Sequence, residues 1–373
     1  MAAEPALYLG LISGTSADGI DVALASFEPS PRLHASLTHA YPDSLRRRVV
    51  DLAQGDGRIA LDELGTLDVE IGREFAAAAQ RLLVQSGVTA HAVRALGSHG
   101  QTVRHRPTLA APYTLQLGDP NVIAELTGIV TVADFRRRDV AAGGQGAPFA
   151  PAFHAALLGA GDRPRAVVNL GGIANITVLA GDGEGAIIGF DTGPANCLLD
   201  AWAERHLGRP FDADGAFAAS GRIDRALLAR LLDDPYFEAA PPKSTGREMF
   251  HPAWLEQRLQ DGSVTAVDVQ ATLVELTART VADAITRHAP GDGPVLVCGG
   301  GVHNPVLMAA LRAALAPARV ESITARGIDP DFVEAMLFAW LARERVLEQP
   351  VTDIARVSGA RGPRVLGAIY FGG

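Results

Sequence analysis

A polar, glycine-containing turn near the N-terminus has the residue types that bind phosphate. It lies in the segment Gly10-Leu-Ile-Ser-Gly-Thr-Ser-Ala-Asp-Gly-Ile-Asp21. Its glycines allow positive φ and let successive N–H groups converge on an anion, and its hydroxyls add donors. It is not a GxxxxGK[ST] loop. The pattern predicts either a polar hairpin turn or a phosphate cradle made by Ser13, Gly14, Thr15, Ser16, Asp18 and Gly19, with the Asp18 carboxylate suited to Mg²⁺.

Two further glycine turns follow strand-like segments. The turn 169–175 contains Gly171 and Gly172, and together with the first turn it resembles a clamp on both sides of a polyphosphate. Gly299, Gly300 and Gly301 follow a buried strand and precede a helix that opens at 302–304, which is a place where backbone packs against a flat ligand or a phosphate. The dinucleotide fingerprint G-x-G-x-x-G is absent, which argues against a Rossmann dehydrogenase.

Two carboxylates stand out by position. Asp191 is expected at the end of a strand, before the Gly193-Pro194 turn, where α/β folds place catalytic groups; capping the next helix is the alternative. Glu334 is the only charged residue from Phe332 to Ala342, on a helix that Asp329 and Pro330 are expected to open. Because an unpaired buried carboxylate is costly, Glu334 either pairs internally, contacts a ligand or lies on an exposed strip.

Other polar clusters surround two glycine-containing segments. His99 and Gln101 flank Gly100 just after an expected strand over 93–96, so their side chains are predicted at a cleft; a structural role is the alternative for His99. The basic run 136–138 precedes Gly-Gly-Gln-Gly, and one of its arginines could bind a substrate carboxylate. Arg136 is our nominal choice.

The segments around these residues are expected to alternate between strands and helices, which favours an α/β fold. Two strand–turn–strand segments, 7–25 and 166–179, lie about half the chain apart and suggest two related halves with a boundary near 128–134. Helices are expected at 62–86, 196–206, 267–288 and 329–347.

Composition removes several classes of protein. The 373 residues carry 33 Lys and Arg against 42 Asp and Glu, a net charge of −9, which argues against a nucleic-acid partner. Cys197 and Cys298 allow neither a disulfide framework nor a cysteine-based zinc site. The N-terminal residues lack a signal-peptide pattern, and no apolar run is long enough for a membrane span. We therefore expect a cytoplasmic protein.

Taken together, the motifs resemble the anhydro-N-acetylmuramic acid kinase family. They run in family order along essentially the whole chain. Ala17, Ala195 and Val302 depart from the usual Met, Gly and Ala, and Ala195 could narrow the backbone beside Asp191. The matching segments are GLISGTSADGID, GSHGQTVRHRP, LQLGDP, TVADFRRRDVAAGGQGAP, NLGGIANIT, GFDTGPAN, PPKSTGREMF, CGGGVHNP, GIDPDFVEAMLFAWLA and the final VLGAIYFGG.

The resemblance implies a fold and a set of roles. The family belongs with sugar kinases, chaperone ATPases and actin, which implies two ribonuclease H-like α/β domains with ATP in the cleft between them. The expected domains are 1–130, completed by 346–373, and 131–345. Asp191 would be the catalytic base, and His99, Gln101, Arg136 and Glu334 would face the sugar. ATP and Mg²⁺ would be held by Ser13 to Asp21, with Asp18 near the metal, by Asn169, Gly171, Gly172 and Asn175, and by Gly299, Gly300, Gly301 and Asn304.

The implied reaction is unusual for a kinase, because O6 of 1,6-anhydro-N-acetylmuramic acid is tied to the anomeric carbon. Asp191 would activate water against that carbon while O6 takes the γ-phosphate of ATP, giving N-acetylmuramic acid 6-phosphate and ADP in cell-wall recycling. The alternatives are an ordinary sugar kinase, a nucleotide-dependent scaffold of the actin or chaperone type, and a glycosidase that uses Asp191 and Glu334. The resemblance also suggests a homodimer.

Overall fold

The computed structural model divides the chain into two compact units. Unit 1 comprises Met1–Leu157 and Gly327–Gly373, and unit 2 comprises Leu158–Arg326. The structure describes residues 5–14, 17–55, 58–159, 163–181, 187–241, 243–246, 249–259, 264–289 and 291–373.

Unit 1 contains a mixed sheet. Its strands are β1 (Leu7–Ser13), β2 (Ile20–Ser26), β3 (Arg32–His39), β4 (Val93–Arg106), β5 (Tyr113–Leu117), β6 (Thr131–Ala133) and β12 (Ala368–Tyr370). They follow the order β12-β6-β4-β1-β2-β3, and β5 pairs with β4. β1, β2 and β3 form an antiparallel meander, whereas β4 and β6 run parallel to β1. This is the strand arrangement of a ribonuclease H-like domain.

Unit 2 repeats that arrangement. Its strands are β7 (Arg165–Leu170), β8 (Ile173–Leu179), β9 (Ile188–Pro194), β10 (Val295–Cys298) and β11 (Val320–Ser322). The order is β11-β10-β7-β8-β9, with an antiparallel meander of β7, β8 and β9 and parallel neighbours β10 and β11. The expectation of two related halves is confirmed, because the two meanders correspond strand for strand.

Helices cover both faces of the sheet of unit 1. Alternation along β1 sends Leu9 and Leu11 into a core shared with Phe75 of α2 (Leu61–Ser86), and sends Gly10 toward α13 (Val333–Val346) on the other face. A Cβ on Gly10 would lie 1.9 Å from the Ala335 carbonyl oxygen, and one on Gly97 would lie 2.0 Å from that of Phe338. These paired glycines therefore let α13 lie directly on the sheet, which fixes the helix that carries Glu334.

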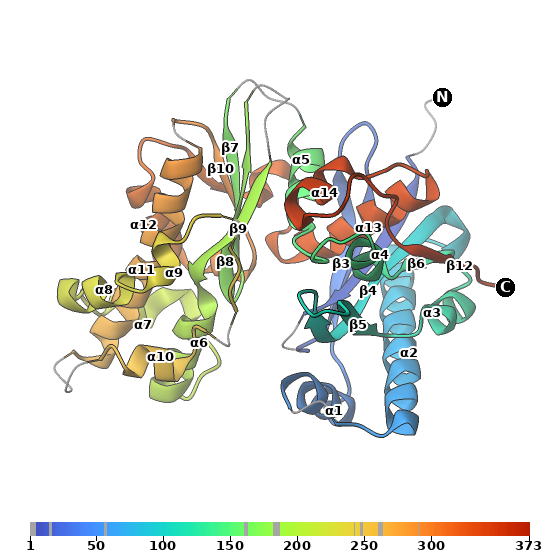
Figure 1. The fold of residues 1–373 in the computed structure, drawn as a ribbon, viewed down its shortest axis with the longest axis horizontal. Helices are drawn as coiled ribbons and strands as arrows, with labels where there is room; N and C mark the ends of the chain where they lie inside the picture. The colour runs from blue at the N-terminus through green and yellow to red at the C-terminus, as the bar shows by residue number, and fades with distance from the viewer. Residues whose placement is uncertain are drawn as a thin grey trace. The chain divides into compact units, whose positions relative to one another are not determined.

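The remaining helices of unit 1 lie around this core. They are α1 (Asp43–Gln54), α3 (Pro120–Thr127), α4 (Phe135–Ala141), α5 (Ala150–Leu158) and α14 (Thr352–Ser358). In unit 2, α11 (Ala266–His288) and α12 (Pro305–Ala314) lie along one side of the sheet (Figure 1). Smaller helices complete that unit: α6 (Asn196–Leu207), α7 (Ala216–Ala219), α8 (Arg225–Leu232), α9 (Pro235–Glu238) and α10 (Pro252–Glu256).

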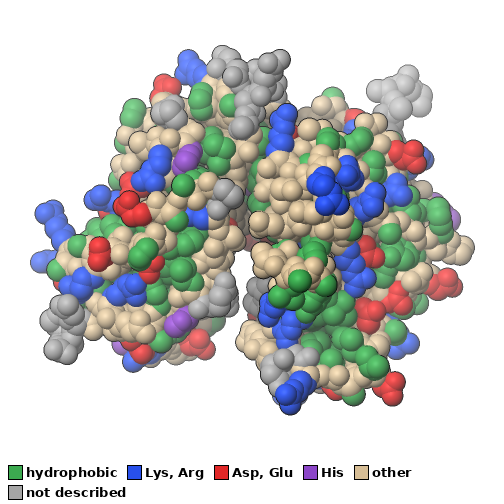
Figure 2. Space-filling model, viewed as in Figure 1, with side chains coloured by type: hydrophobic (Ala, Val, Ile, Leu, Met, Phe, Trp, Pro, Cys, Tyr) green, Lys and Arg blue, Asp and Glu red, His purple; other side chains and the backbone are tan. Residues whose placement is uncertain are grey.

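Two surface properties can be stated for the described part of the chain. None of its helices has both the length and the apolar character that crossing a bilayer requires. Basic and acidic side chains are interspersed on the visible face of each unit, without an extended field of one sign (Figure 2).

The structure corrects three sequence expectations. The units divide at 157/158 and 326/327, not at 130/131 and 345/346, because β6 pairs with β4 and α13 packs on β1 and β4. Strand β4 does not stop at residue 96 but runs through His99 and Gln101, since it pairs first with β1 and then with β5. Asp191 lies inside β9, three residues before its end at Pro194, because the Gly193-Pro194 pair belongs to the strand.

Candidate active site

The first glycine turn is clamped by a side chain from β4. Ser13 donates its hydroxyl to Gln101 Oε1 at 2.6 Å, and Gln101 Nε2 donates to the Gly14 carbonyl at 3.1 Å. Gln101 has no exposed surface. Its amide therefore shapes the start of the turn from within the protein, a role that the sequence reading, which had it face the sugar, did not include.

The backbone of this turn differs from the one we expected. Among the residues of this turn that the structure describes, the positive φ, 51°, falls on Ala17, a fully buried residue, and not on Gly19. A Cβ on Gly19 would lie 2.7 Å from a methyl carbon of Thr38, so this glycine is required by packing against β3. Asp18 is exposed and accepts from Arg46 Nη2 at 2.7 Å. Thr15 and Ser16, also expected here, lie outside the described residues.

Carboxylates gather where β2 begins and α13 begins. Asp21 accepts from the Thr38 hydroxyl at 2.6 Å. The pKa of Asp21 is raised overall, mainly because the carboxylate is partly buried; the bond from Thr38 opposes this rise, and the nearby negative charge of Asp331 adds to it. Glu334 is exposed on a helix whose following residues, 335–342, are buried. The pKa of Glu334 is raised overall. The largest cause is the surrounding protein, which disfavours the charged form; the positive charge of Arg136 offsets part of this rise, and the negative charge of Asp21 adds to it. Among the alternatives for Glu334, an exposed position on the helix is the one observed, and that leaves it accessible to a ligand.

Arg136, on α4, is held by two acceptors. Its Nε donates to His99 Nε2 at 2.8 Å, and its Nη1 donates to the Gly146 carbonyl at 2.7 Å. His99 is 7% exposed, and its Nδ1 lies 2.9 Å from the Gly100 carbonyl, so Nδ1 carries the proton and Nε2 accepts. Burial and then Arg136 lower the pKa of His99 well below its usual range. His99 is thus a neutral orienting group for Arg136.

In unit 2, Asp191 is placed beside the second glycine turn. It is the cross-strand partner of Asn175, which lies two residues after the start of β8 at Ile173. Its Oδ2 accepts from the Ser244 hydroxyl at 2.7 Å and from the Thr245 N–H at 2.9 Å. The helix-capping alternative is excluded, because α6 has Ala195 as its N-cap and no side-chain cap bond.

Sequence reasoning missed the residues that orient Asp191. Ser244 and Thr245 bind its carboxylate, the Lys243 carbonyl accepts its N–H at 3.3 Å, and the Tyr236 hydroxyl donates to its carbonyl at 2.6 Å. The available signal was the polar run Lys-Ser-Thr-Gly after two prolines in PPKSTGREMF. That run indicates a turn with free donors, but nothing in it specifies contact with a strand about fifty positions away.

The second and third glycine motifs pack on each other. Cys298 pairs with Asn169 across β10 and β7. A Cβ on Gly299, whose φ is 81°, would lie 2.3 Å from Asn169 Oδ1, and one on Gly301 would lie 2.6 Å from Leu170 Cβ. Nothing lies within 4 Å of a Cβ placed on Gly300. Two glycines therefore serve packing, while the one between them faces open space.

Residues at the ends of these turns also accept hydrogen bonds from the first N–H groups of α6 and α12. The carbonyls of Gly171 and Gly172 accept from the N–H groups of Asn196 and Cys197 at 3.1 and 3.0 Å, which satisfies the start of α6. The Asn304 side chain accepts from Val306 and Leu307 N–H groups, both at 3.1 Å, as the N-cap of α12. Asn304 thereby fixes the helix that follows the third motif.

Ala195 does not narrow the approach to Asp191. It is 1% exposed and belongs to the apolar core of unit 2, with an ordinary φ of −126°. The extra methyl, compared with glycine, is therefore directed into the core.

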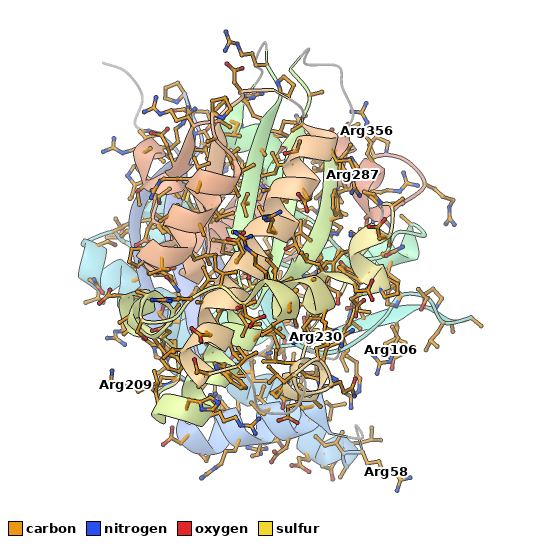
Figure 3. The ribbon with its side chains drawn as sticks, turned by 90° about the vertical axis from the view of Figure 1, so that its left-hand side faces the viewer. Arg58, Arg106, Arg209, Arg230, Arg287 and Arg356 are labelled. Atoms are coloured by element: carbon orange, nitrogen blue, oxygen red, sulfur yellow. The ribbon has the colours of Figure 1, made fainter. Side chains whose placement is uncertain are left out.

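A cavity of about 140 Å³ lies beside β9, lined by Phe190 and Thr192 together with Lys243, Arg287 and His288. Figure 3 labels Arg287, which comes from the last turn of α11. The ladder between β8 and β9 is irregular here, because Asn175 pairs with Asp191 and Ala174 pairs with Gly193, which leaves Thr192 as an extra residue in β9. Asp191 itself does not line the cavity.

A metal site has to be judged from the donors present. Within the described residues, no three His, Cys, Asp or Glu side chains are grouped so that they could hold a metal ion. Mg²⁺ commonly takes only one or two protein carboxylates and completes its shell with phosphate oxygens and water. Exposed Asp18 and half-buried Asp21, in and beside the first turn, fit that kind of site.

Comparisons with known proteins agree along nearly the whole chain. The family model described as anhydro-N-acetylmuramic acid kinase matches residues 6–372. Curated proteins of that name from Xanthomonas axonopodis pv. citri (strain 306) and from Coxiella burnetii (strain Dugway 5J108-111) are 59% and 48% identical to this chain. The matches cover 98% of this chain in both cases, and 98% and 97% of those proteins.

Solved structures are more distant. The activator of 2-hydroxyisocaproyl-CoA dehydratase from Clostridium difficile, with bound ADPNP, superposes with a TM-score of 0.47 at 11% identity. The match covers 92% of this chain and 96% of that one. At that level the likeness does not bear on function.

Proposed function

Because the chain belongs to the anhydro-N-acetylmuramic acid kinase family, we propose how its two units carry out that family's reaction. The protein is an ATP-dependent kinase that opens the 1,6-anhydro ring of 1,6-anhydro-N-acetylmuramic acid and phosphorylates O6. The products are N-acetylmuramic acid 6-phosphate and ADP, and the reaction belongs to cell-wall recycling. The scaffold and ordinary sugar-kinase alternatives are not favoured by this membership.

Asp191 is the general base in this proposal. Its carboxylate takes a proton from water, the water oxygen bonds to the anomeric carbon, and the bond from that carbon to O6 breaks. The electron pair released on O6 forms the new bond to the γ-phosphorus of ATP, and ADP leaves. The observation that carries this assignment is the fixed orientation of Asp191 by Ser244, Thr245 and Tyr236 beside the second glycine turn.

The glycine motifs hold the nucleotide. In unit 1, the clamp of Gln101 on Ser13 and Gly14 presets the first turn for phosphate oxygens. In unit 2, the 169–175 turn and the glycines 299–301 present backbone to the rest of ATP, with open space over Gly300. Asp18 and Asp21 would hold Mg²⁺, which supplies positive charge to a transferring phosphoryl group.

Sugar recognition falls to unit 1. Arg136 is aligned on two sides by His99 and Gly146, and it binds the lactyl carboxylate as a charge-assisted donor. The exposed Glu334 accepts from sugar hydroxyl or amide groups. Gln101 acts indirectly, through the turn that it clamps.

A coupled ADP-release assay with purified 1,6-anhydro-N-acetylmuramic acid tests the proposal. We expect ADP release with the anhydro sugar and none with N-acetylmuramic acid. Equal turnover of the reducing sugar would contradict ring opening, and sugar-independent ATP hydrolysis would favour a scaffold. A reaction without ATP, in which the formation of reducing sugar is measured, serves as the control for simple glycosidase activity.

A cytoplasmic location and a homodimeric state are further proposals that follow from family resemblance and from the need for ATP. Light scattering after size-exclusion chromatography measures the oligomeric state. Fractionation of the source cells with an antibody against the chain measures the location.

A further inference from the structure

A buried carboxylate lies behind Arg136. Asp139, one turn further along α4, is 1% exposed. Its Oδ2 accepts from the Gly146 N–H at 2.7 Å, and its Oδ1 accepts from the Ser358 hydroxyl at 2.8 Å. A Cβ on Gly144 would lie 2.2 Å from Asp139 Oδ2, so the loop closes on the carboxylate only because residue 144 is glycine.

Gly146 connects this carboxylate to Arg136. It donates its N–H to Asp139 and offers its carbonyl to Arg136 Nη1 at 2.7 Å. The orientation of that carbonyl therefore depends on the bond that Asp139 makes to the same residue. Asp139 is also close enough to Arg136 for their charges to interact.

The C-terminal segment completes the network. Ser358 is the last residue of α14 and is 2% exposed. Besides its bond to Asp139, its carbonyl accepts from Gln145 N–H at 2.8 Å, and Arg361 N–H donates to the Ala142 carbonyl at 3.0 Å. A contact 219 positions apart in the chain thus holds the loop that orients the arginine.

We propose that Asp139 and Ser358 are positioning residues, which fix the Gly146 carbonyl and through it the guanidinium of Arg136 for an acidic sugar. The inference rests on the proposed role of Arg136 at the lactyl carboxylate. Neither side chain contacts substrate; both act by holding one edge of the guanidinium in place. Around metal sites, removing a group that orients a ligating side chain costs about ten- to a hundredfold in affinity or activity, and we expect an effect of the same order here.

A double-mutant cycle tests this proposal. Asp139→Ala is expected to raise KM for the anhydro sugar about tenfold, with KM for ATP unchanged. Because Asp139 acts through Arg136, Asp139→Ala should add no further increase in an Arg136→Ala background. Ser358→Ala, which leaves the bond to Gly146, should give a smaller rise of the same kind. Asp139→Asn can keep the bond to Gly146, so its KM for the sugar should stay close to that of the wild type.

The matched control is Asp224→Ala. Asp224 is also a carboxylate that accepts a backbone N–H, that of Leu227 at 2.7 Å, but it does so as the N-cap of α8 in unit 2. It should lower Tm without changing KM for the sugar. A rise in KM after Arg136→Ala, with none after Asp139→Ala or, if that variant does not fold, none after Ser358→Ala, would overturn the positioning role alone. No change in KM after Arg136→Ala would overturn the role of Arg136 in sugar binding, and the inference with it.

A second readout uses 1,6-anhydro-N-acetylglucosamine, which lacks the lactyl carboxylate, as a competitive inhibitor. Its inhibition constant should be the same for the wild type and for Asp139→Ala. A parallel loss for both ligands would show a general distortion of the site and would contradict the proposal.

Discussion

The two units share one strand order but hold their candidate site residues by different means. In unit 1, side chains from distant segments hold the site: His99 accepts from Arg136, and Gln101 donates to the backbone of the first turn. In unit 2, the backbone at Gly299 and Gly301 packs closely on Asn169 and Leu170, and one carboxylate, Asp191, is held by a polar loop.

This difference separates two kinds of work done by one fold. Unit 1 positions charged side chains, so we expect substitutions in its site to change the affinity for an acidic sugar and the pH dependence. Unit 2 positions the glycine turns and the carboxylate of Asp191, so we expect substitutions in its site to change kcat and the affinity for the nucleotide. The predictions below separate the two responses.

The largest effect is expected at Asp191. Asp191→Asn keeps the size of the side chain but removes the base, so kcat should fall about 10²- to 10⁴-fold while ATP still binds. Steady-state kinetics and titration with an ATP analogue measure both quantities. A near-normal kcat would assign Asp191 a structural role and would remove the chemical function from unit 2. Ser244→Ala should give a smaller loss, because Thr245 N–H still holds Oδ2.

Acid should destabilise the protein through a buried histidine of unit 1. His154 is 1% exposed, and burial lowers its pKa from 6.5 to about 4. Below pH 6.5 the unfolded chain therefore binds a proton that the folded chain does not, so stability falls as pH falls from 6.5 to 4. This one group accounts for about 3 kcal/mol at the lower end.

His154→Leu should flatten the dependence of Tm on pH between 6.5 and 4. The matched control is His206→Leu in unit 2, where the histidine is exposed and the slope should change far less. An unchanged slope after His154→Leu would contradict the assignment of a buried neutral histidine.

Arg136→Lys sharpens the contrast on the sugar side. Lysine keeps the charge but loses the planar fork that His99 and Gly146 align, so KM for the anhydro sugar should rise about tenfold. KM for ATP should stay the same, as measured by initial rates with each substrate varied in turn. A rise in the KM for ATP alone would place Arg136 at the nucleotide.

The smallest expected effect is at Gly300. A methyl group there meets nothing in the protein, so Gly300→Ala should leave Tm unchanged and raise KM for ATP a few-fold. Gly299→Ala, whose Cβ would overlap Asn169 and whose φ is 81°, should instead lower Tm. Equal behaviour of the two variants would contradict the division between a packing glycine and a ligand-facing one.

Local patterns predicted the elements well and the contacts between distant segments poorly. The helix expected at 62–86 is observed at Leu61–Ser86, because periodicity acts over a few residues. The helix expected at 329–347 is divided: Asp329 caps a short 3-10 helix, Pro330–Phe332, and α13 itself begins at Val333. The sequence could not show that α13 packs on the glycine pair Gly10 and Gly97, since neither position indicates which helix crosses the strand there. For the same reason, the sequence could not predict the bonds of Gln101 to the first turn or the bond from Ser358 to Asp139.

The strand errors have a related cause. Gly-Ser-His-Gly-Gln has the composition of a turn, yet β4 continues through it because strands on both sides supply pairing. Composition reports what a segment prefers alone, whereas pairing partners in the sheet decide where the strand ends.

The central claim is that a water molecule activated by Asp191 opens the anhydro ring before O6 is phosphorylated. Running the reaction in ¹⁸O-labelled water and quenching it before the anomeric oxygen exchanges tests this directly, with unlabelled product in the same water as the control. We predict ¹⁸O at the anomeric oxygen and none in the phosphate, with both labelling and ADP release lost in Asp191→Asn. Label in the phosphate, or undiminished labelling in that variant, would contradict the account.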